Sequence, residues 1–69
     1  AKCMRERLQV VFSTVIEMEK ETGMVEKTVL LNELETKHKI ARGEAERLLG
    51  QLLREGTLFE PREGYLKKT

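Results

Sequence analysis

Few side chains in this sequence have the types and spacing that catalysis or metal binding requires. His38 is the only histidine and Cys3 is the only cysteine. A structural zinc site takes four ligands of this kind, and a Cys–His pair would require the N-terminus to fold back over a helix end. We therefore expect no metal site, and we expect His38 to cover the edge of the hydrophobic core.

Pairs of glutamates are the remaining candidates for acid–base chemistry. Glu33 and Glu35 are separated by two positions, as are Glu44 and Glu46. Side chains with this spacing point in different directions on a helix, so we expect both pairs to be solvated surface. The sequence also lacks the phosphate-binding pattern GxxxxGK[ST]. It therefore predicts no catalytic residue and no cofactor-binding residue in this chain.

Basic and amide side chains that could contact DNA or a protein partner are concentrated in the second half of the chain. Residues 1–35 contain five Lys or Arg and seven Glu, a net charge of −2, whereas residues 36–69 contain eight and five, a net charge of +3. The candidate contact residues are Arg42, Arg47, Gln51, Arg62, Lys67 and Lys68.

Acidic residues close to these candidates reduce the charge that DNA would meet. Arg42 and Glu46 are four residues apart, and Glu44 and Arg47 are three apart, so each pair can neutralise itself on a helix. Helices that read the major groove use unpaired Arg, Lys, Asn or Gln. The pattern therefore favours weak, non-specific DNA binding or protein contact over sequence-specific recognition.

A long amphipathic helix begins the chain. Apolar residues recur every three or four positions from Met4 to about Glu21, which predicts a helix, and Gly23 is suited to end it. Val10 lies outside the apolar stripe, so we expect it to be exposed. A short extended segment, residues 24–27, is expected to follow.

Two further helices are expected, joined by a short turn. Thr28 is expected to cap a helix over residues 29–37, and a third helix is expected over residues 42–55, with Gly56 at its C-terminal end. Ala41, which precedes the third helix, has no side chain that can cap. The residues expected to face the core are Leu30, Leu31 and Leu34 in the second helix and Ala45, Leu48, Leu49, Leu52 and Leu53 in the third.

The C-terminal residues change to a strand pattern. Residues 57–60 and 65–68 predict a β-hairpin, because Pro61 presets the first turn position and Gly64 supplies a positive φ. A lone hairpin is marginally stable in water, so it must pack on the helices or pair with residues 24–27. We expect Phe59 and Tyr65 to pack in the core or on the hairpin rather than to stack on bases.

The expected fold class is mainly α with a small β-hairpin (α+β), a winged helix-turn-helix in the order α-β-α-α-β-β. At 69 residues and 39% hydrophobic content, the chain fits a single domain, residues 1–69, with one core. It cannot form an internal disulfide, which suits a reducing compartment. No signal peptide and no membrane-spanning run is visible, so we expect no membrane partner.

The stretch from Ala45 to Lys68 resembles the C-terminal winged-helix domain of archaeal minichromosome maintenance (MCM) replicative DNA helicases. The resemblance rests on Leu-Leu-Arg-Glu-Gly at 52–56, Leu-Phe-Glu-Pro at 58–61, Gly64-Tyr65 and the basic residues that follow. It implies that the chain is a C-terminal fragment of a hexameric, ATP-dependent helicase in the archaeal cytoplasm, associated with the nucleoid. The ATP and Mg²⁺ sites of that helicase would lie upstream.

The resemblance further implies a regulatory role in DNA replication. The domain would modulate the ATPase and helicase activity through contacts with the motor domains of its own chain or with a replication-initiation protein, together with weak, non-specific DNA contacts. The neutral third helix and the apolar Val10 and Phe59 favour protein docking, whereas Arg42, Arg47 and the basic hairpin favour DNA contact. The alternative is a winged-helix DNA-binding domain of a transcriptional regulator.

Overall fold

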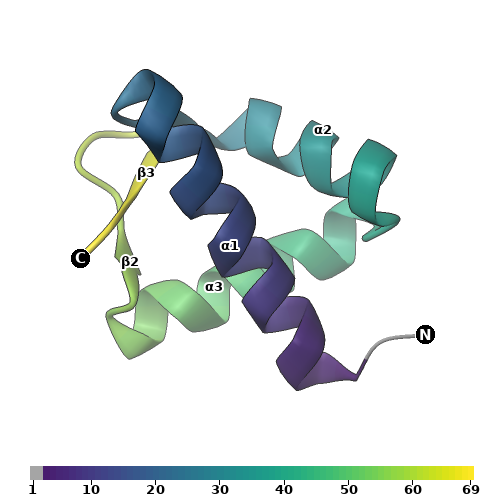
Figure 1. Ribbon diagram of the computed structural model, residues 1–69. Helices are drawn as coiled ribbons and strands as arrows, with labels where there is room; N and C mark the ends of the chain where they lie inside the picture. The colour runs from purple at the N-terminus through teal and green to yellow at the C-terminus, as the bar shows by residue number, and fades with distance from the viewer. Residues whose placement is uncertain (1–2) are drawn as a thin grey trace.

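The computed structural model describes residues 3–69, which form three helices and three short strands. The helices are α1 (Met4–Thr22), α2 (Lys27–His38) and α3 (Arg42–Glu55), and the strands are β1 (Val25–Glu26), β2 (Leu58–Phe59) and β3 (Tyr65–Lys68). Helix α1 crosses α2 and α3 and contacts both (Figure 1). The fold is therefore mainly helical with a small antiparallel sheet, an α+β arrangement in the predicted element order.

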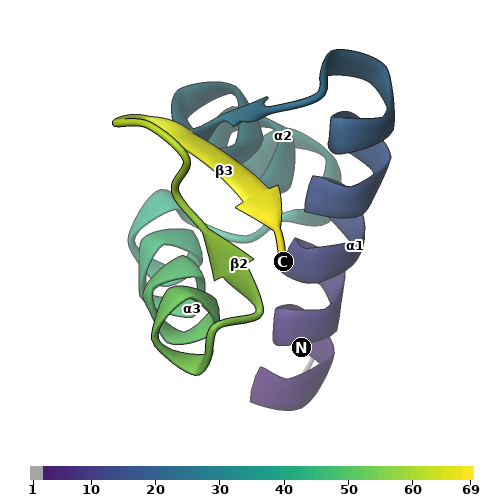
Figure 2. The same ribbon diagram turned by 90° about the vertical axis from the view of Figure 1, so that its left-hand side faces the viewer.

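Strand β3 is the centre of the sheet and pairs antiparallel with β1 on one side and β2 on the other. Val25 lies opposite Leu66, and Phe59 lies opposite Lys67. The hairpin thus gains a third strand from the segment between α1 and α2, which confirms the expected pairing and stabilises strands that would be marginal alone. Figure 2 shows the three strands lying together beside the helices.

One hydrophobic core joins all six elements. The predicted inward residues of α2 and α3 all belong to it except Leu53, which is only partly buried. Ile40, which lies in the turn between α2 and α3, is also buried, and its N–H donates to the Leu34 carbonyl at 3.0 Å, which holds the turn against the end of α2. The buried apolar residues are Val11, Val15, Val25, Leu30, Leu31, Leu34, Ile40, Ala45, Leu48, Leu49, Leu52, Leu58 and Leu66.

The start of α2 differs from the prediction. The helix begins at Lys27 with Glu26 as its N-cap residue, so Thr28 lies inside the helix and does not cap it. Glu26 is held extended by its pairing with Tyr65 in β3, and the Lys27 N–H donates to the Gly64 carbonyl at 2.9 Å. The hairpin therefore satisfies one of the donors that the first turn of α2 leaves unpaired, a role expected of Thr28.

Two expectations for α1 are wrong. Val10 is partly buried and packs against the core, because α1 contacts two helices and two strands and needs a wider apolar face than a single stripe. Met4, the first residue of the predicted apolar stripe, lies at the N-terminal end of α1 and is 39% exposed. The polar residues that lie away from the apolar stripe are all exposed: Glu6, Gln9, Ser13, Glu17 and Glu21. Among residues 3–69, none of the helices combines the length and apolar character of a membrane span.

Glycines end α3 and close the hairpin as predicted. Gly56 has φ 80° in the left-handed region at the end of α3, and Gly64 has φ 86° immediately before β3. The loop is longer than expected, because β2 ends at Phe59 and residues 60–64 connect the strands. Glu60 leaves the strand and accepts a hydrogen bond from the Gly64 N–H at 2.9 Å.

Candidate functional site

Helix α3 carries three of the six candidate contact residues on its outer surface. Its inner face is occupied by leucines, so Arg42 and Arg47 extend outward and their side chains are 57% and 53% exposed. Gln51 follows Arg47 by one helical turn. The N-terminus of α3 has no side-chain cap, because Ala41 occupies the N-cap position as predicted.

Each of these three side chains is bound to a glutamate of the same helix. Arg47 binds Glu44 through two short contacts, from Nη2 to Oε1 and to Oε2, both 2.8 Å. Arg42 lies 3.7 Å from Glu46, and the Gln51 amide donates to Glu55 at 3.1 Å. The two arginine pairs confirm the neutralisation expected from their spacing, and the Gln51 contact extends it along the helix.

Glu44 also connects α3 to α1. Its Oε2 accepts a hydrogen bond from Arg7 Nε at 3.0 Å, in addition to the bonds from Arg47. The hydrogen bond from Arg47, followed by the charges of Arg47 and Arg7, lowers the pKa of Glu44 below its ordinary value of 4.5. Glu44 therefore stays ionised and holds negative charge near the start of α3, where a phosphate would otherwise approach.

The hairpin carries the other three candidates, and Lys67 is turned toward α1. Its Nζ lies 3.3 Å from Glu19 Oε2 and 3.1 Å from the Gly23 carbonyl. The backbone N–H of Lys68 donates to Glu19 Oε1 at 3.0 Å, and this bond is the main reason that the pKa of Glu19 is lowered. Lys67 thus fastens the last strand to α1 and is only 35% exposed.

Arg62 and Lys68 are the candidates that remain available. Neither side chain forms an ion pair with another residue in the described range 3–69. The Arg62 guanidinium lies 4.4 Å from the ring centroid of Tyr65, a cation–π contact that holds it at the hairpin. Phe59 is 41% exposed on β2, so it is not a core residue, and of the two expected positions only packing on the hairpin remains.

The structure therefore divides the predicted residues into two groups of different character. In the α3 group, every candidate side chain is bound to a glutamate of the same helix. In the hairpin group, Lys67 is bound to Glu19, whereas Arg62 and Lys68 form no ion pair within residues 3–69. Sequence spacing indicates the contacts within α3. It does not indicate Glu19, whose lysine partner is 48 residues away, or the contact of Arg7 with Glu44 over 37 residues. Glu19 and Arg7 are therefore the residues that sequence reasoning missed.

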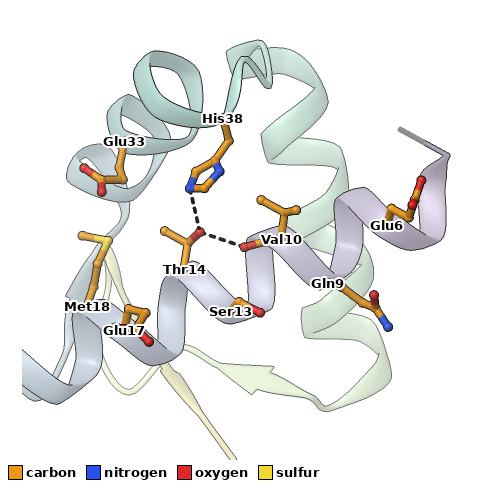
Figure 3. A pocket seen from close by; sticks show the side chains of 9 residues that line it. All are labelled: Glu6, Gln9, Val10, Ser13, Thr14, Glu17, Met18, Glu33 and His38. Carbon is orange, nitrogen blue, oxygen red and sulfur yellow. Dashed lines mark hydrogen bonds between the residues drawn. The ribbon is translucent and has the colours of Figure 1, made fainter. Parts of the chain in front are cut away.

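A separate groove of about 470 Å³ lies between α1 and α2. His38 stands at its edge, and Figure 3 shows the imidazole ring pointing toward Thr14, with Nε2 3.5 Å from the Thr14 hydroxyl. Thr14 is buried and donates its hydroxyl to the Val10 carbonyl at 2.7 Å. Within residues 3–69, no three His, Cys or Glu side chains are grouped so that they could hold a metal ion.

Comparison with protein-family models and with curated protein sequences found no match to this chain.

Proposed function

We propose that this chain is a winged-helix module of a replicative DNA helicase of the MCM type, and that it modulates the motor through protein contacts. The winged-helix interpretation is supported by the element order, by the α2–α3 pair and by the three-stranded sheet that includes the C-terminal hairpin. The helicase interpretation is supported by the resemblance of residues 45–68.

The glutamates bound to the α3 side chains are the main reason to prefer a protein partner over DNA. Arg42, Arg47 and Gln51 are each bound to an acid of the same helix. An exposed ion pair contributes only about 0.2–1 kcal/mol, so DNA could separate one. The released carboxylates would then face the phosphates, and no net positive charge would be gained. Affinity for nucleic acid depends on the number of phosphates neutralised, which is small here.

Titration with labelled DNA tests this preference directly. Duplex and single-stranded oligonucleotides are added to the purified chain at low and at moderate salt, and binding is followed by fluorescence anisotropy. We expect weak binding, with a dissociation constant of about 10⁻⁴ M or above at physiological salt, and no dependence on sequence. Tight binding of one duplex sequence would contradict the proposal and would support the transcriptional-regulator alternative.

The hairpin supports a second, weaker function in contacting the DNA backbone. Arg62 and Lys68 form no ion pairs within residues 3–69, unlike Arg42 and Arg47 of α3. Arg62→Glu is expected to abolish the remaining salt-dependent binding, whereas Arg42→Glu is expected to change it less. An equal loss in both variants would place the DNA contact on α3 as well.

The regulatory role is tested in a complete helicase chain that ends in this module. Removing residues 1–69 should leave ATP hydrolysis and unwinding intact and should increase their rates. A tethered domain is held near the ring at an effective concentration on the order of millimolar, so even a weak contact can restrain the motor. Steady-state ATPase and unwinding assays measure the change, and a loss of ATP hydrolysis on removal would contradict the regulatory role.

A further inference from the structure

The groove between α1 and α2 is a surface distinct from the α3 and hairpin candidates. It is lined by one side of α1 and by Glu33 and His38 of α2, and none of the six candidate contact residues contributes to it (Figure 3). Its volume of about 470 Å³ is sufficient for a few side chains of a partner. A ligand in this groove would therefore not overlap any of the candidate DNA contacts.

The groove is lined by two apolar side chains, Val10 and Met18, and by the buried Thr14, beside the exposed Gln9 and Ser13. Val10 and Met18 form its floor and pack on the core from their other side. The hydroxyl of Thr14 donates to the Val10 carbonyl at 2.7 Å, so it does not require a ligand. This floor suits aliphatic groups, and the flexible thioether of Met18 can adapt to their shape.

The rim of the groove is negatively charged from both helices. Glu17 lies on the α1 side and Glu33 on the α2 side, and Glu6 lies at the far end. Glu33 pairs with Lys37 at 3.1 Å, but the lysine side chain is 68% exposed, so a stronger partner can replace it at little cost. The carbonyl end of α2 is at His38, and a helix C-terminus also favours cations.

An apolar floor between acidic rims complements long basic side chains. The methylene stems of Lys and Arg bury against apolar surface while their charged groups reach outward. The same charges repel nucleic acid and acidic peptides. We propose that this groove docks a basic, amphipathic segment of a protein partner, with its stems on Val10 and Met18 and its charged groups at Glu17 and Glu33. The proposed function does not assign its protein contacts to a surface, and a peptide titration tests this groove without reference to helicase activity.

Titration with a synthetic peptide tests this proposal. The probe is a short amphipathic peptide of leucine and lysine, and the control peptide has glutamate at each lysine position. Amide ¹⁵N–¹H spectra of the chain are recorded during each titration. We expect the lysine peptide alone to shift resonances of groove residues, including Thr14, Met18 and His38. Shifts distributed over the whole surface, or shifts confined to the α1–α3 side near Phe12, would overturn the proposal.

Two charge-reversal variants distinguish peptide binding in the groove from attraction of the peptide by the net charge of the chain. Glu17→Lys changes an exposed residue on the rim, and Glu35→Lys makes the same change in net charge at an exposed residue of α2 that does not line the groove. We expect Glu17→Lys to weaken peptide binding by about tenfold and Glu35→Lys by less than about twofold. Equal weakening would mean that only net charge attracts the peptide. Thermal melting of both variants shows whether the fold is retained.

Discussion

Two glutamates connect parts of the chain that are distant in sequence. Glu19 of α1 receives hydrogen bonds from the backbone of Lys68 and the side chain of Lys67, and Glu44 of α3 receives them from Arg47 and Arg7. Both acids have a pKa below the ordinary value of 4.5 because these donors favour the ionised form. Their ionisation is therefore linked to folding.

The lowered pKa values predict a loss of stability in acid. A carboxylate whose pKa is lower in the folded state stabilises the fold fully above its unfolded value, and this contribution disappears as the pH falls through the folded value. We expect the stability that depends on Glu19 and Glu44 to be present at pH 7 and to be lost below about pH 4.5. Thermal melting measured from neutral to acid pH follows this loss.

Glu19→Gln isolates the contribution of one of these acids. The variant is expected to lose about 1 kcal/mol of stability at neutral pH, because the amide is a weaker acceptor and cannot pair with Lys67. At low pH, where Glu19 is protonated, it should match the parent. Glu21→Gln is the matched control, because Glu21 is exposed on the same helix. A deficit that is constant with pH would show that the contact contributes through packing alone.

The hairpin requires a positive φ at position 64, which glycine adopts readily. The φ of 86° at Gly64 is strained for any residue with a Cβ, although nothing lies within 4 Å of the position that a Cβ would occupy. Gly64→Val is therefore expected to cost about 1–2 kcal/mol through backbone strain. Gly43→Ala, in α3 and equally uncrowded, should instead stabilise by about 0.5–1 kcal/mol. Urea unfolding measures both changes, and equal effects would contradict the conformational explanation.

At the scale of elements, α3 holds the core together, since it packs against α1, α2 and β2. Leu48 and Leu52 lie one turn apart on its inner face and are 0% and 5% exposed. Truncation of either leucine to alanine is expected to cost about 2–5 kcal/mol, a large fraction of the stability of so small a domain. Leu53→Ala should cost less because Leu53 is only partly buried. Chemical denaturation compares the three variants, and an inverted order would mean that the inner face is misassigned.

The sheet is the element that depends most on its neighbours. Its strands contain two, two and four residues, too few to be stable as an isolated hairpin. Leu58, Leu66 and Val25 bury one face against the helices, and Lys68 and Lys67 bind Glu19 on α1. The hairpin is thus a part of the core rather than an appended arm.

At the scale of the whole molecule, the distribution of charge separates two surfaces. Three glutamates, Glu6, Glu17 and Glu33, line the groove between α1 and α2, whereas the two basic candidate contact residues without an ion pair within residues 3–69, Arg62 and Lys68, lie on the hairpin. The total net charge of +1 conceals this difference, because the acidic first half offsets the basic second half. A partner with a basic segment and a polyanion would therefore approach the molecule from different sides.

Removing Glu44 should convert α3 into a better DNA-binding surface. Glu44→Gln releases Arg47 from the carboxylate that binds it, so we expect DNA affinity to rise several-fold and the slope of log affinity against log salt to steepen by about 1. Glu35→Gln makes the same change in net charge away from α3. Anisotropy titrations at several salt concentrations compare the variants, and equal increases would show that net charge alone controls binding.

The sequence was sufficient to predict the elements whose signals are local. The extent of α3, its inward leucines, the end of α3 at Gly56 and the positive φ of Gly64 follow from helical periodicity and from the conformational freedom of glycine. The Arg47–Glu44 and Arg42–Glu46 pairs follow from the geometry of one helical turn. These features depend on neighbours within a few residues.

Only the tertiary structure decided the features that depend on contacts between elements. Val10 is partly buried because α1 crosses other elements, and Thr28 does not cap because Gly64 of the hairpin accepts the Lys27 N–H. The fastening of Lys67 by Glu19 and the groove between α1 and α2 arise in the same way. Periodicity describes one element at a time, whereas these features are set by the angle and register at which separate elements pack.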